Sequence, residues 1–291
     1  MLYRIVVGKQ LDAHQKREVQ KIIDTTFSEI DRTYNKWNPN SEVSKLNRAK
    51  AERKHPLSKE LESFLLQTHK IVKLSGGKFD PTIEPLQRLW RSKLEKGLIP
   101  SSEEVEKVKV ATGWEKIHVD SGLFWKDHDE ASIDLGGIAK GYAIDLIVER
   151  LNEAGYPDVY VEWGGEIRTA GKHPEGRPWR VFVSKLGNPN PSSAVAIVDL
   201  DNQAVATSGD YLQNWTVEGT TFFHIIDPAS GYPLQARSGT TCSATVIAQS
   251  CMLADALATV AMLFSSPKES REWLEKVQNE IPHMRFWVHS R

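Results

Sequence analysis

Hydrophobic positions in the first third of the chain follow a pattern that predicts one strand and four helices. Residues 2 to 7 are mostly apolar, as in a strand, and residues 12 to 34 carry apolar side chains at helical spacing. The same spacing returns from Leu57 to Val72, where Gly76-Gly77 closes the second helix. It returns again from Leu86 to Leu94, and Ser101 to Glu104 then caps a further short helix.

Beyond residue 155 the helical spacing gives way to runs that are typical of strands. We expect strands at residues 159–161, 179–183, 194–200, 221–226, 240–248 and 284–289, with two helices before the last, and a hairpin at residues 117–125. These elements predict an α+β fold with helices packed on mixed or antiparallel sheets. Because no linker or repeat divides the chain, we expect one domain over residues 1–291, or two subdomains whose boundary the sequence does not assign.

Three polar segments interrupt these elements. Residues 37–42 form a turn-rich loop in which Trp37 either packs on the core or offers a stacking surface for a flat ring. In residues 79–85, two prolines predict an extended connection that leaves Asp80 and Thr82 with free polar side chains. Residues 206–211 predict a loop whose glycine allows another group to approach the backbone closely.

The most informative segment runs from Ser132 to Gly155. Residues 132–135 alternate as in a short strand, Gly136-Gly137 supplies a turn, and apolar residues then follow helical spacing. Lys140 lies in the first helical turn, where its charge opposes the helix dipole unless an anion lies between them. A phosphate is one such anion; the alternative is a solvated lysine. The known phosphate-binding motifs of nicotinamide-dependent enzymes and nucleotide triphosphatases are absent.

A second informative helix spans residues 250–264 and is apolar almost all round, so it is predicted to be buried. Asp255 is its one charge, and Thr259 follows on the same face. Such oxygens suit Mg²⁺, although a carboxylate paired with a loop or an arginine is the alternative. His224, near the end of a predicted strand, is a candidate acid, base or phosphate donor. Together these features suggest magnesium-assisted chemistry on a phosphorylated ligand.

Composition narrows the possibilities further. The net charge of −1 offers no field to attract nucleic acid, and no apolar run is long enough to span a bilayer. Only Cys242 and Cys251 are present, without the spacing of a zinc or redox motif, and the histidines form no zinc-binding pair. A serine hydrolase motif is also missing.

At these residues the sequence resembles the ApbE family of FAD:protein FMN transferases through nearly its whole length. The matching strings occur in family order and at family-like spacing: Ser41 to Asn47, Gly76 to Trp90, Ile133 to Asp145, Gly164 to Glu166, Ala206 to Tyr211, His224 to Pro233, and Ala254 to Thr259.

The resemblance implies a Mg²⁺-dependent enzyme that cleaves FAD and joins FMN by a phosphoester to a Thr or Ser hydroxyl of an acceptor flavoprotein, releasing AMP. It implies acceptors such as redox-pump subunits with a Ser/Thr-Gly-Ala-Ser/Thr segment. It assigns the metal to the Gly137 carbonyl and the Asp255 and Thr259 side chains, with Asp255 and His224 as catalytic residues. The FAD contacts would be Trp37, Asp80, Pro81, Thr82, Asp134, Lys140, His224 and Ile226, in a cleft between the loops and the glycine turn.

Some features depart from the family pattern. Trp37 stands where the family often has Tyr, which favours the stacking interpretation. The lipoprotein leader of many members is missing, so we expect a periplasmic or membrane-anchored protein if a leader was removed, and a cytoplasmic one if the chain is complete. Two other functions use the same residues: an FAD pyrophosphatase that gives FMN and AMP, and a protein that binds FAD without chemistry.

Overall fold

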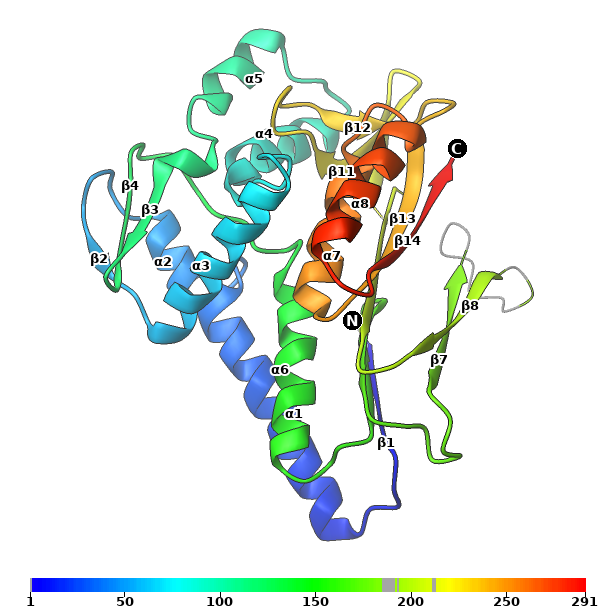
Figure 1. Cartoon of the computed structure of the whole chain (residues 1–291). Helices are drawn as coiled ribbons and strands as arrows, with labels where there is room; N and C mark the ends of the chain where they lie inside the picture. Colours follow the sequence, from blue (N-terminus) through cyan, green and yellow to red (C-terminus); the bar gives the residue numbers. More distant parts are fainter. Residues whose placement is uncertain (1, 185–191, 193, 211–212) are drawn as a thin grey trace. The chain divides into compact units, whose positions relative to one another are not determined.

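The computed structural model describes residues 2–184, 192, 194–210 and 213–291, which form two compact units (Figure 1). Unit 1 comprises residues 1–30, 137–209 and 241–290. Unit 2 comprises residues 31–136 and 210–240 together with Arg291. None of the helices described has the length and apolar character needed to cross a membrane.

Unit 1 is built on a six-stranded sheet whose neighbouring strands are all antiparallel, in the order β1-β5-β6-β9-β13-β14. Its strands are β1 (Tyr3–Val7), β5 (Val159–Trp163), β6 (Glu166–Ala170), β9 (Ala204–Gly209), β13 (Thr241–Ala248) and β14 (Arg285–Ser290). A separate antiparallel hairpin joins β7 (Trp179–Ser184) and β8 (Ala194–Leu200). The helices are α1 (Ala13–Tyr34), which belongs to unit 1 up to Ile30, α6 (Ala139–Glu153), α7 (Cys251–Met262) and α8 (Pro267–Glu280).

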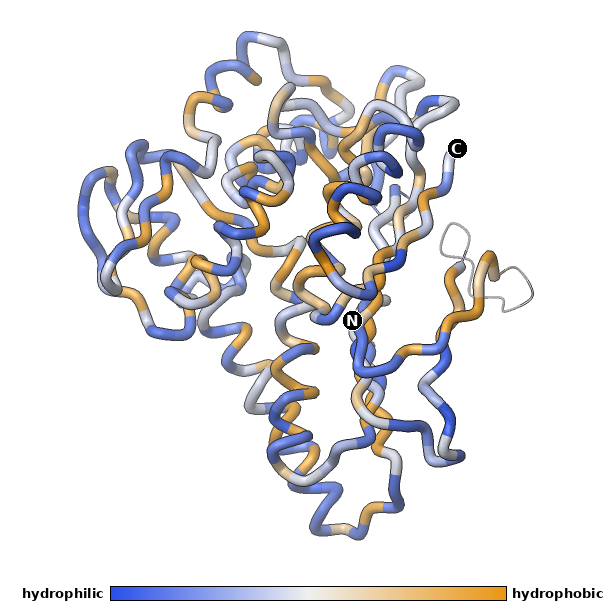
Figure 2. Tube along the Cα trace, viewed as in Figure 1, coloured by the Kyte–Doolittle hydropathy of each residue, from blue (hydrophilic) through white to orange (hydrophobic). Residues whose placement is uncertain are grey.

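The two faces of this sheet carry different cores. In β5, Val159 and Val161 pack against α1 and α6, whereas Tyr160 between them points to the other face and joins the core under the β7-β8 hairpin. This alternation follows from the two-residue period of a strand. Figure 1 shows α6 and α7 on one side of the sheet and the hairpin on the other, and Figure 2 shows the hydrophobic residues that line both layers.

Unit 2 has fewer and shorter strands than unit 1, and they form two small antiparallel sheets. One has the order β2-β4-β3, from β2 (His55–Pro56), β4 (Leu123–Lys126) and β3 (Ile117–Asp120); the other is β10 (Asn214–Val217), β11 (Thr220–Ile226) and β12 (Pro233–Gln235). The helices are α2 (Glu42–Asn47), α3 (Lys59–Leu74), α4 (Glu84–Leu94) and α5 (Ser102–Lys109), with 3-10 turns η1 (Pro81–Ile83) and η2 (Trp114–Lys116).

Most of the predicted helices and strands are present, and the antiparallel sheets with packed helices confirm the α+β prediction. The capping box at Ser101 and Glu104 begins α5 as expected, and Ser250 caps the apolar helix α7.

The predicted strand at residues 132–135 is wrong. This segment is extended but pairs with no neighbouring strand, because its partner is a side chain. The Asn47 amide donates to the Ile133 carbonyl at 2.9 Å and accepts from the Ile133 N–H at 2.7 Å. An asparagine side chain therefore satisfies the backbone groups that a second strand would otherwise have to pair. The turn at Gly136-Gly137 and the helix after it are confirmed.

Two further predictions are corrected. The residues around Pro81 and Pro85 are helical rather than extended, since Pro81 begins η1 and Pro85 lies in the first turn of α4, where a helix tolerates proline. The predicted loop at residues 206–211 is mostly strand, because residues up to Gly209 belong to β9 and pair with β13. Tyr211 lies outside the described residues.

Candidate functional site

Unit 1 gathers three charged side chains from the first turn of α6, the start of β6 and the middle of α7. Lys140, the second residue of α6, forms an ion pair with Glu166, the first residue of β6. The Asp255 carboxylate on α7 is 4% exposed and lies close enough to interact electrostatically with both. We call Lys140, Glu166 and Asp255 the lysine–carboxylate cluster.

Burial dominates the electrostatics of this cluster. Burial raises the pKa of Asp255 to about 7; the Lys140 charge opposes this shift and the Glu166 charge adds to it. Burial also raises the pKa of Glu166, again against the effect of Lys140. Burial alone would lower the pKa of Lys140, but the carboxylates of Asp255 and Glu166 together raise it. Lys140 is therefore a permanent cation held by two carboxylates.

This cluster leaves two buried oxygens without a hydrogen-bond partner in the described part of the chain, Oδ2 of Asp255 and Oε2 of Glu166. One turn along α7, the Thr259 hydroxyl lies 3.0 Å from the Ser208 hydroxyl. When both acids are ionised, the two carboxylates exceed the single lysine by one negative charge. A hard cation with oxygen ligands fits such a set, because it would satisfy the unpartnered oxygen and neutralise the excess charge.

The acidic side chains described near Asp255 are too few to bind a metal ion by themselves. In the described residues, no three Asp, Glu, His or Cys side chains gather as a metal site. A cation at Asp255 would thus depend on hydroxyl or main-chain oxygens as well. Gly137, the predicted carbonyl ligand, lies in the turn immediately before α6.

The end of α7 that precedes Asp255 is anchored to α6. The Asp145 carboxylate accepts hydrogen bonds from the main-chain N–H groups of Cys251 at 2.8 Å and Met252 at 2.9 Å, the free donors of the first turn of α7. Arg168 pairs with the same carboxylate at 2.8 Å. A Cβ at Gly141 would lie 2.4 Å from the Cys251 carbonyl oxygen, so only glycine allows the two helices this approach.

Unit 2 holds a second set of predicted residues around Trp37. The indole is 65% exposed, which excludes the interpretation that it packs on the core. Lys36 Nζ and the Arg91 guanidinium lie 4.9 Å and 4.8 Å from the ring centre. Lys36 also pairs with Glu84 and, at 3.0 Å, with Asp134. The predicted residues Trp37 and Asp134 are therefore brought together through Lys36.

Asp80 and Thr82 lie at η1, and neither has the free polar side chain that we expected. Asp80 Oδ1 accepts from both the N–H and the hydroxyl of Thr82, at 2.8 Å and 2.6 Å. The Thr82 hydroxyl is buried and accepts from the Gly113 N–H. The 3-10 turn is responsible, because it brings the two side chains back onto the local backbone. Burial raises the pKa of Asp80 despite these bonds.

The remaining predicted residues lie on or beside these elements. Pro81 is buried, and its carbonyl accepts from the Asp134 N–H at 2.7 Å, so the Asp80 and Asp134 segments are in contact. His224 lies on β11, as predicted, and is half-buried. Ile226 ends the same strand, and its side chain is buried in a core with Leu86 and Trp90.

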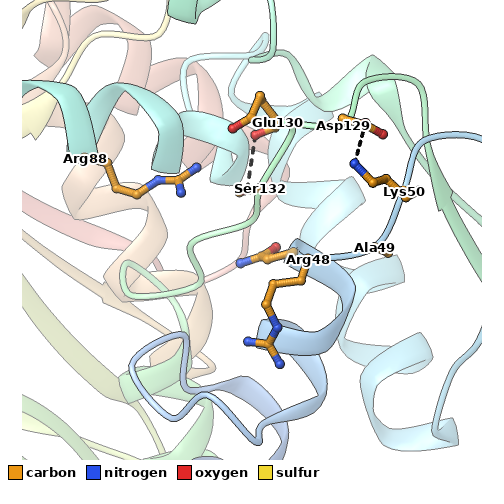
Figure 3. Close-up of a pocket in the computed structure, with 8 residues that line it drawn as sticks. Arg48, Ala49, Lys50, Arg88, Asp129, Glu130 and Ser132 are labelled. Carbon is orange, nitrogen blue, oxygen red and sulfur yellow. Dashed lines mark hydrogen bonds and ion pairs between the residues drawn. The ribbon is translucent and has the colours of Figure 1, made fainter.

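Unit 2 also contains a small pocket of about 230 Å³ (Figure 3). Figure 3 shows Lys50 paired with Asp129 on one side, and Arg88 and Glu130 on another. The complete lining is Asn47, Arg48, Ala49, Lys50, Arg88, Asp129, Glu130 and Ser132. The lining carries both positive and negative side chains, and Lys50 and Asp129 pair with each other, so no ligand is assigned to this pocket.

The sequence alone does not indicate the partners of several site residues. Glu166 enters the sequence argument only as part of the matching string Gly164 to Glu166, and nothing in the local pattern distinguishes Lys36 or Glu84. Their roles depend on contacts between residues 26 positions apart or more, which local spacing does not reveal. The family resemblance did include the segment that contains Glu166, which was the one available signal.

Comparison with known sequences places these residues in a family context. The sequence profile described as the ApbE family matches residues 1–284. An FAD:protein FMN transferase from Chlamydia pneumoniae is 42% identical over 278 residues, which cover 95% of this chain and 86% of that protein. One from Vibrio cholerae is 30% identical over 282 residues, which cover 96% of this chain and 82% of that protein.

Solved structures agree with the sequence comparison. The apo form of the flavinyl transferase ApbE from Pseudomonas stutzeri superposes with a TM-score of 0.83 at 27% identity and covers 99% of this chain and 90% of its own. The ApbE protein from Thermotoga maritima has a TM-score of 0.83 at 30% identity, and the match covers 98% of this chain and 90% of that one. The α+β fold with antiparallel sheets is therefore shared with these proteins.

Proposed function

We propose, since the chain belongs to the ApbE family and is an FAD:protein FMN transferase, that it uses Mg²⁺ and joins FMN to a Thr or Ser hydroxyl. One observation supports the metal-dependent form of this activity most strongly. Asp255 is a buried carboxylate with an unpartnered oxygen, one helical turn from the Thr259 hydroxyl. A buried charge is unfavourable without compensation, and a bound cation supplies it.

The residues proposed to hold the metal are Asp255, Thr259 and the main-chain carbonyl of Gly137. When bound, Mg²⁺ would neutralise the charge that develops on the pyrophosphate oxygens of FAD. Glu166 keeps Lys140 oriented toward the same region. We propose that the Lys140 ammonium, with the free N–H groups at the start of α6, binds the phosphates of FAD.

The transfer step breaks one phosphorus–oxygen bond and forms another. The acceptor hydroxyl oxygen attacks the phosphorus of the FMN half, the bond to the AMP phosphate breaks, and AMP leaves with the electron pair. The hydroxyl proton passes to a base. Asp255 is the proposed base because its buried carboxylate has an oxygen without a hydrogen-bond partner among the described residues. His224 is proposed to orient the phosphate or to act as an acid.

The proposed FAD contacts are those implied by the family resemblance. Trp37 supports this assignment through its exposed indole, on which a flat ring can stack. Asp134 and Asp80 are held by hydrogen bonds before any ligand arrives, which reduces the entropy lost on binding. The other proposed contacts are Pro81, Thr82, Lys140, His224 and Ile226. A cleft between these loops and the glycine turn stays a prediction.

The test combines the protein, FAD, Mg²⁺ and a flavoprotein domain with a Ser/Thr-Gly-Ala-Ser/Thr segment. Intact mass spectrometry of the acceptor and an AMP assay measure the two products. We expect the acceptor to gain one FMN with one AMP released, and both products to fall by about 100-fold or more in Asp255→Ala. Asp201→Asn, at an exposed aspartate of the same unit, is the control and should behave as the wild type.

The outcomes separate the alternatives. AMP without labelled acceptor, across several acceptor domains, would indicate an FAD pyrophosphatase. FAD binding without either product would indicate a carrier protein. Equal activity with Mg²⁺ and with a chelator would contradict the metal-dependent mechanism.

A further inference from the structure

Lys126 is a lysine buried within unit 2 whose charge is compensated by main-chain carbonyls. Lys126 is the last residue of β4 and is 1% exposed. The ammonium donates to the carbonyl oxygens of Asn47 at 2.9 Å, Asp129 at 2.9 Å and Ala131 at 2.6 Å. Each of its three protons therefore has one acceptor. No carboxylate of the described residues lies within ion-pair distance of it, so the three carbonyl dipoles provide its direct contacts.

A buried lysine with this arrangement joins segments that are distant in sequence. Asn47 ends α2, whereas Asp129 and Ala131 belong to the connection between β4 and the turn before α6. Asn47 is held at its main chain by Lys126 and at its side chain by both backbone groups of Ile133. The ammonium and the amide together fix the path of residues 131–133.

That path sets the position of Asp134, the next residue. The Asp134 N–H donates to the Pro81 carbonyl at 2.7 Å, and its carboxylate accepts from the Gly136 N–H at 2.8 Å and pairs with Lys36 at 3.0 Å. A shift of residues 131–133 would move the Asp134 carboxylate and, through Lys36, the surroundings of Trp37. Asp134 and Trp37 are proposed FAD contacts, whereas Lys126 itself is buried and is not one of them.

We propose that Lys126 is a positioning residue for FAD binding, which acts by clamping the Asn47 and Ala131 carbonyls and thereby orienting Asp134. This inference rests on the proposed function for its ligand. The Lys126 ammonium lies among carbonyl oxygens as a bound monovalent cation would. Because it is part of the chain, it is present at this position without binding from solution. An apolar residue in its place leaves the buried Ala131 carbonyl and the part-buried Asn47 and Asp129 carbonyls without this donor.

The test is equilibrium binding of FAD, followed by its fluorescence, to the wild type, to Lys126→Ala and to Lys50→Ala. Lys50 is the matched control, because it pairs with the side chain of Asp129, whose main-chain carbonyl accepts from Lys126, but is 69% exposed at its own side chain. We expect the Kd for FAD to rise about tenfold in Lys126→Ala and to be unchanged in Lys50→Ala. In the transfer assay, KM for FAD should rise while kcat falls less than about threefold, because the residues proposed to hold the metal belong to unit 1, whereas Lys126 and the carbonyls it contacts belong to unit 2.

Chemical rescue distinguishes positioning from a general loss of stability. Propylammonium has the three carbons and the nitrogen that the Lys126→Ala substitution removes, and we expect it to restore FAD affinity, whereas 1-propanol should not. If Lys126→Ala fails to fold, Lys126→Gln, which keeps two donors without the charge, should show a smaller rise in Kd.

The possible failures can be told apart. A wild type that does not bind FAD would contradict the proposed function. Wild-type binding with an unchanged Kd in a folded Lys126→Ala or Lys126→Gln variant would overturn the positioning role. A tenfold fall in kcat with no change in KM for FAD in these variants would overturn the positioning role as well.

Discussion

Each unit holds a lysine against two carboxylates, yet the two arrangements differ in how completely the acids are paired. In unit 2, Lys36 faces Glu84 and Asp134; Asp134 also accepts from Gly136, and Glu84 has Arg88 at 3.8 Å. In unit 1, Lys140 faces Glu166 and Asp255, each with one buried oxygen that lacks a hydrogen bond from the described residues. The acids around Lys36 therefore have more partners than those around Lys140, and the proposed Mg²⁺ would supply the partner that Asp255 lacks.

The largest expected effect concerns the stability of the metal-free protein. Asp255 has a pKa of about 7 in the folded state against 3.8 for an ordinary Asp, so the folded state retains a proton that the unfolded chain loses. The stability contributed by this protonation is fully present below about pH 4 and is lost as pH rises to about 7, at about 1.4 kcal/mol for each pKa unit. In a chelator at pH 8, Asp255→Asn should therefore be more stable than the wild type.

Urea unfolding at several pH values measures this difference. The advantage of Asp255→Asn should shrink from pH 8 toward pH 4, and added Mg²⁺ should stabilise the wild type more than the variant. If the variant is less stable than the wild type at pH 8 without metal, Asp255 has a partner that the cluster geometry does not include.

The second prediction tests the difference between the two lysines by changing one glutamate partner of each. Glu166→Gln keeps the shape of the side chain but removes the charge that holds Lys140, so the apparent affinity for Mg²⁺ should fall about 10- to 100-fold. Glu84→Gln removes the corresponding partner of Lys36 and should leave the Mg²⁺ dependence unchanged. Titration of the transfer rate with Mg²⁺ at saturating FAD measures both. Equal shifts in the two variants would refute the distinction between the clusters.

A third prediction concerns the contact that positions Asp255. Gly141→Ala places a Cβ 2.4 Å from the Cys251 carbonyl, so α7 must move or strain must accumulate. Because both helices are buried, we expect a loss of about 1–3 kcal/mol in the free energy of unfolding. Gly155→Ala is the less crowded comparison, since no atom lies within 4 Å of its added Cβ, although its positive φ adds a backbone penalty. Only Gly141→Ala should also weaken the Mg²⁺ dependence.

These residues also indicate what the sequence could predict. A single charge in an otherwise apolar helix is visible in the sequence, so Asp255 was identified, and its burial follows from the helix pattern. The partners of Lys140 and Lys36 come from distant elements, so they were not identified. The predicted strand at residues 132–135 is wrong for a related reason. The side chain of Asn47, 86 residues before Ile133, pairs with the backbone in place of a neighbouring strand. Apolar alternation predicts an extended backbone but not what pairs with it.

The smallest expected effect concerns Trp37. Trp37→Ala removes an exposed indole that two cations approach and that belongs to no core, so folding stability should change little. If the indole stacks on a flat ring of FAD, its loss should weaken binding by about 1 kcal/mol, which is a roughly fivefold rise in KM for FAD with kcat nearly unchanged. Trp37→Tyr should recover most of the affinity, since tyrosine keeps an aromatic face. A fall in kcat with an unchanged KM would instead place Trp37 in the chemical step, and unit 2 would then contribute more than substrate binding.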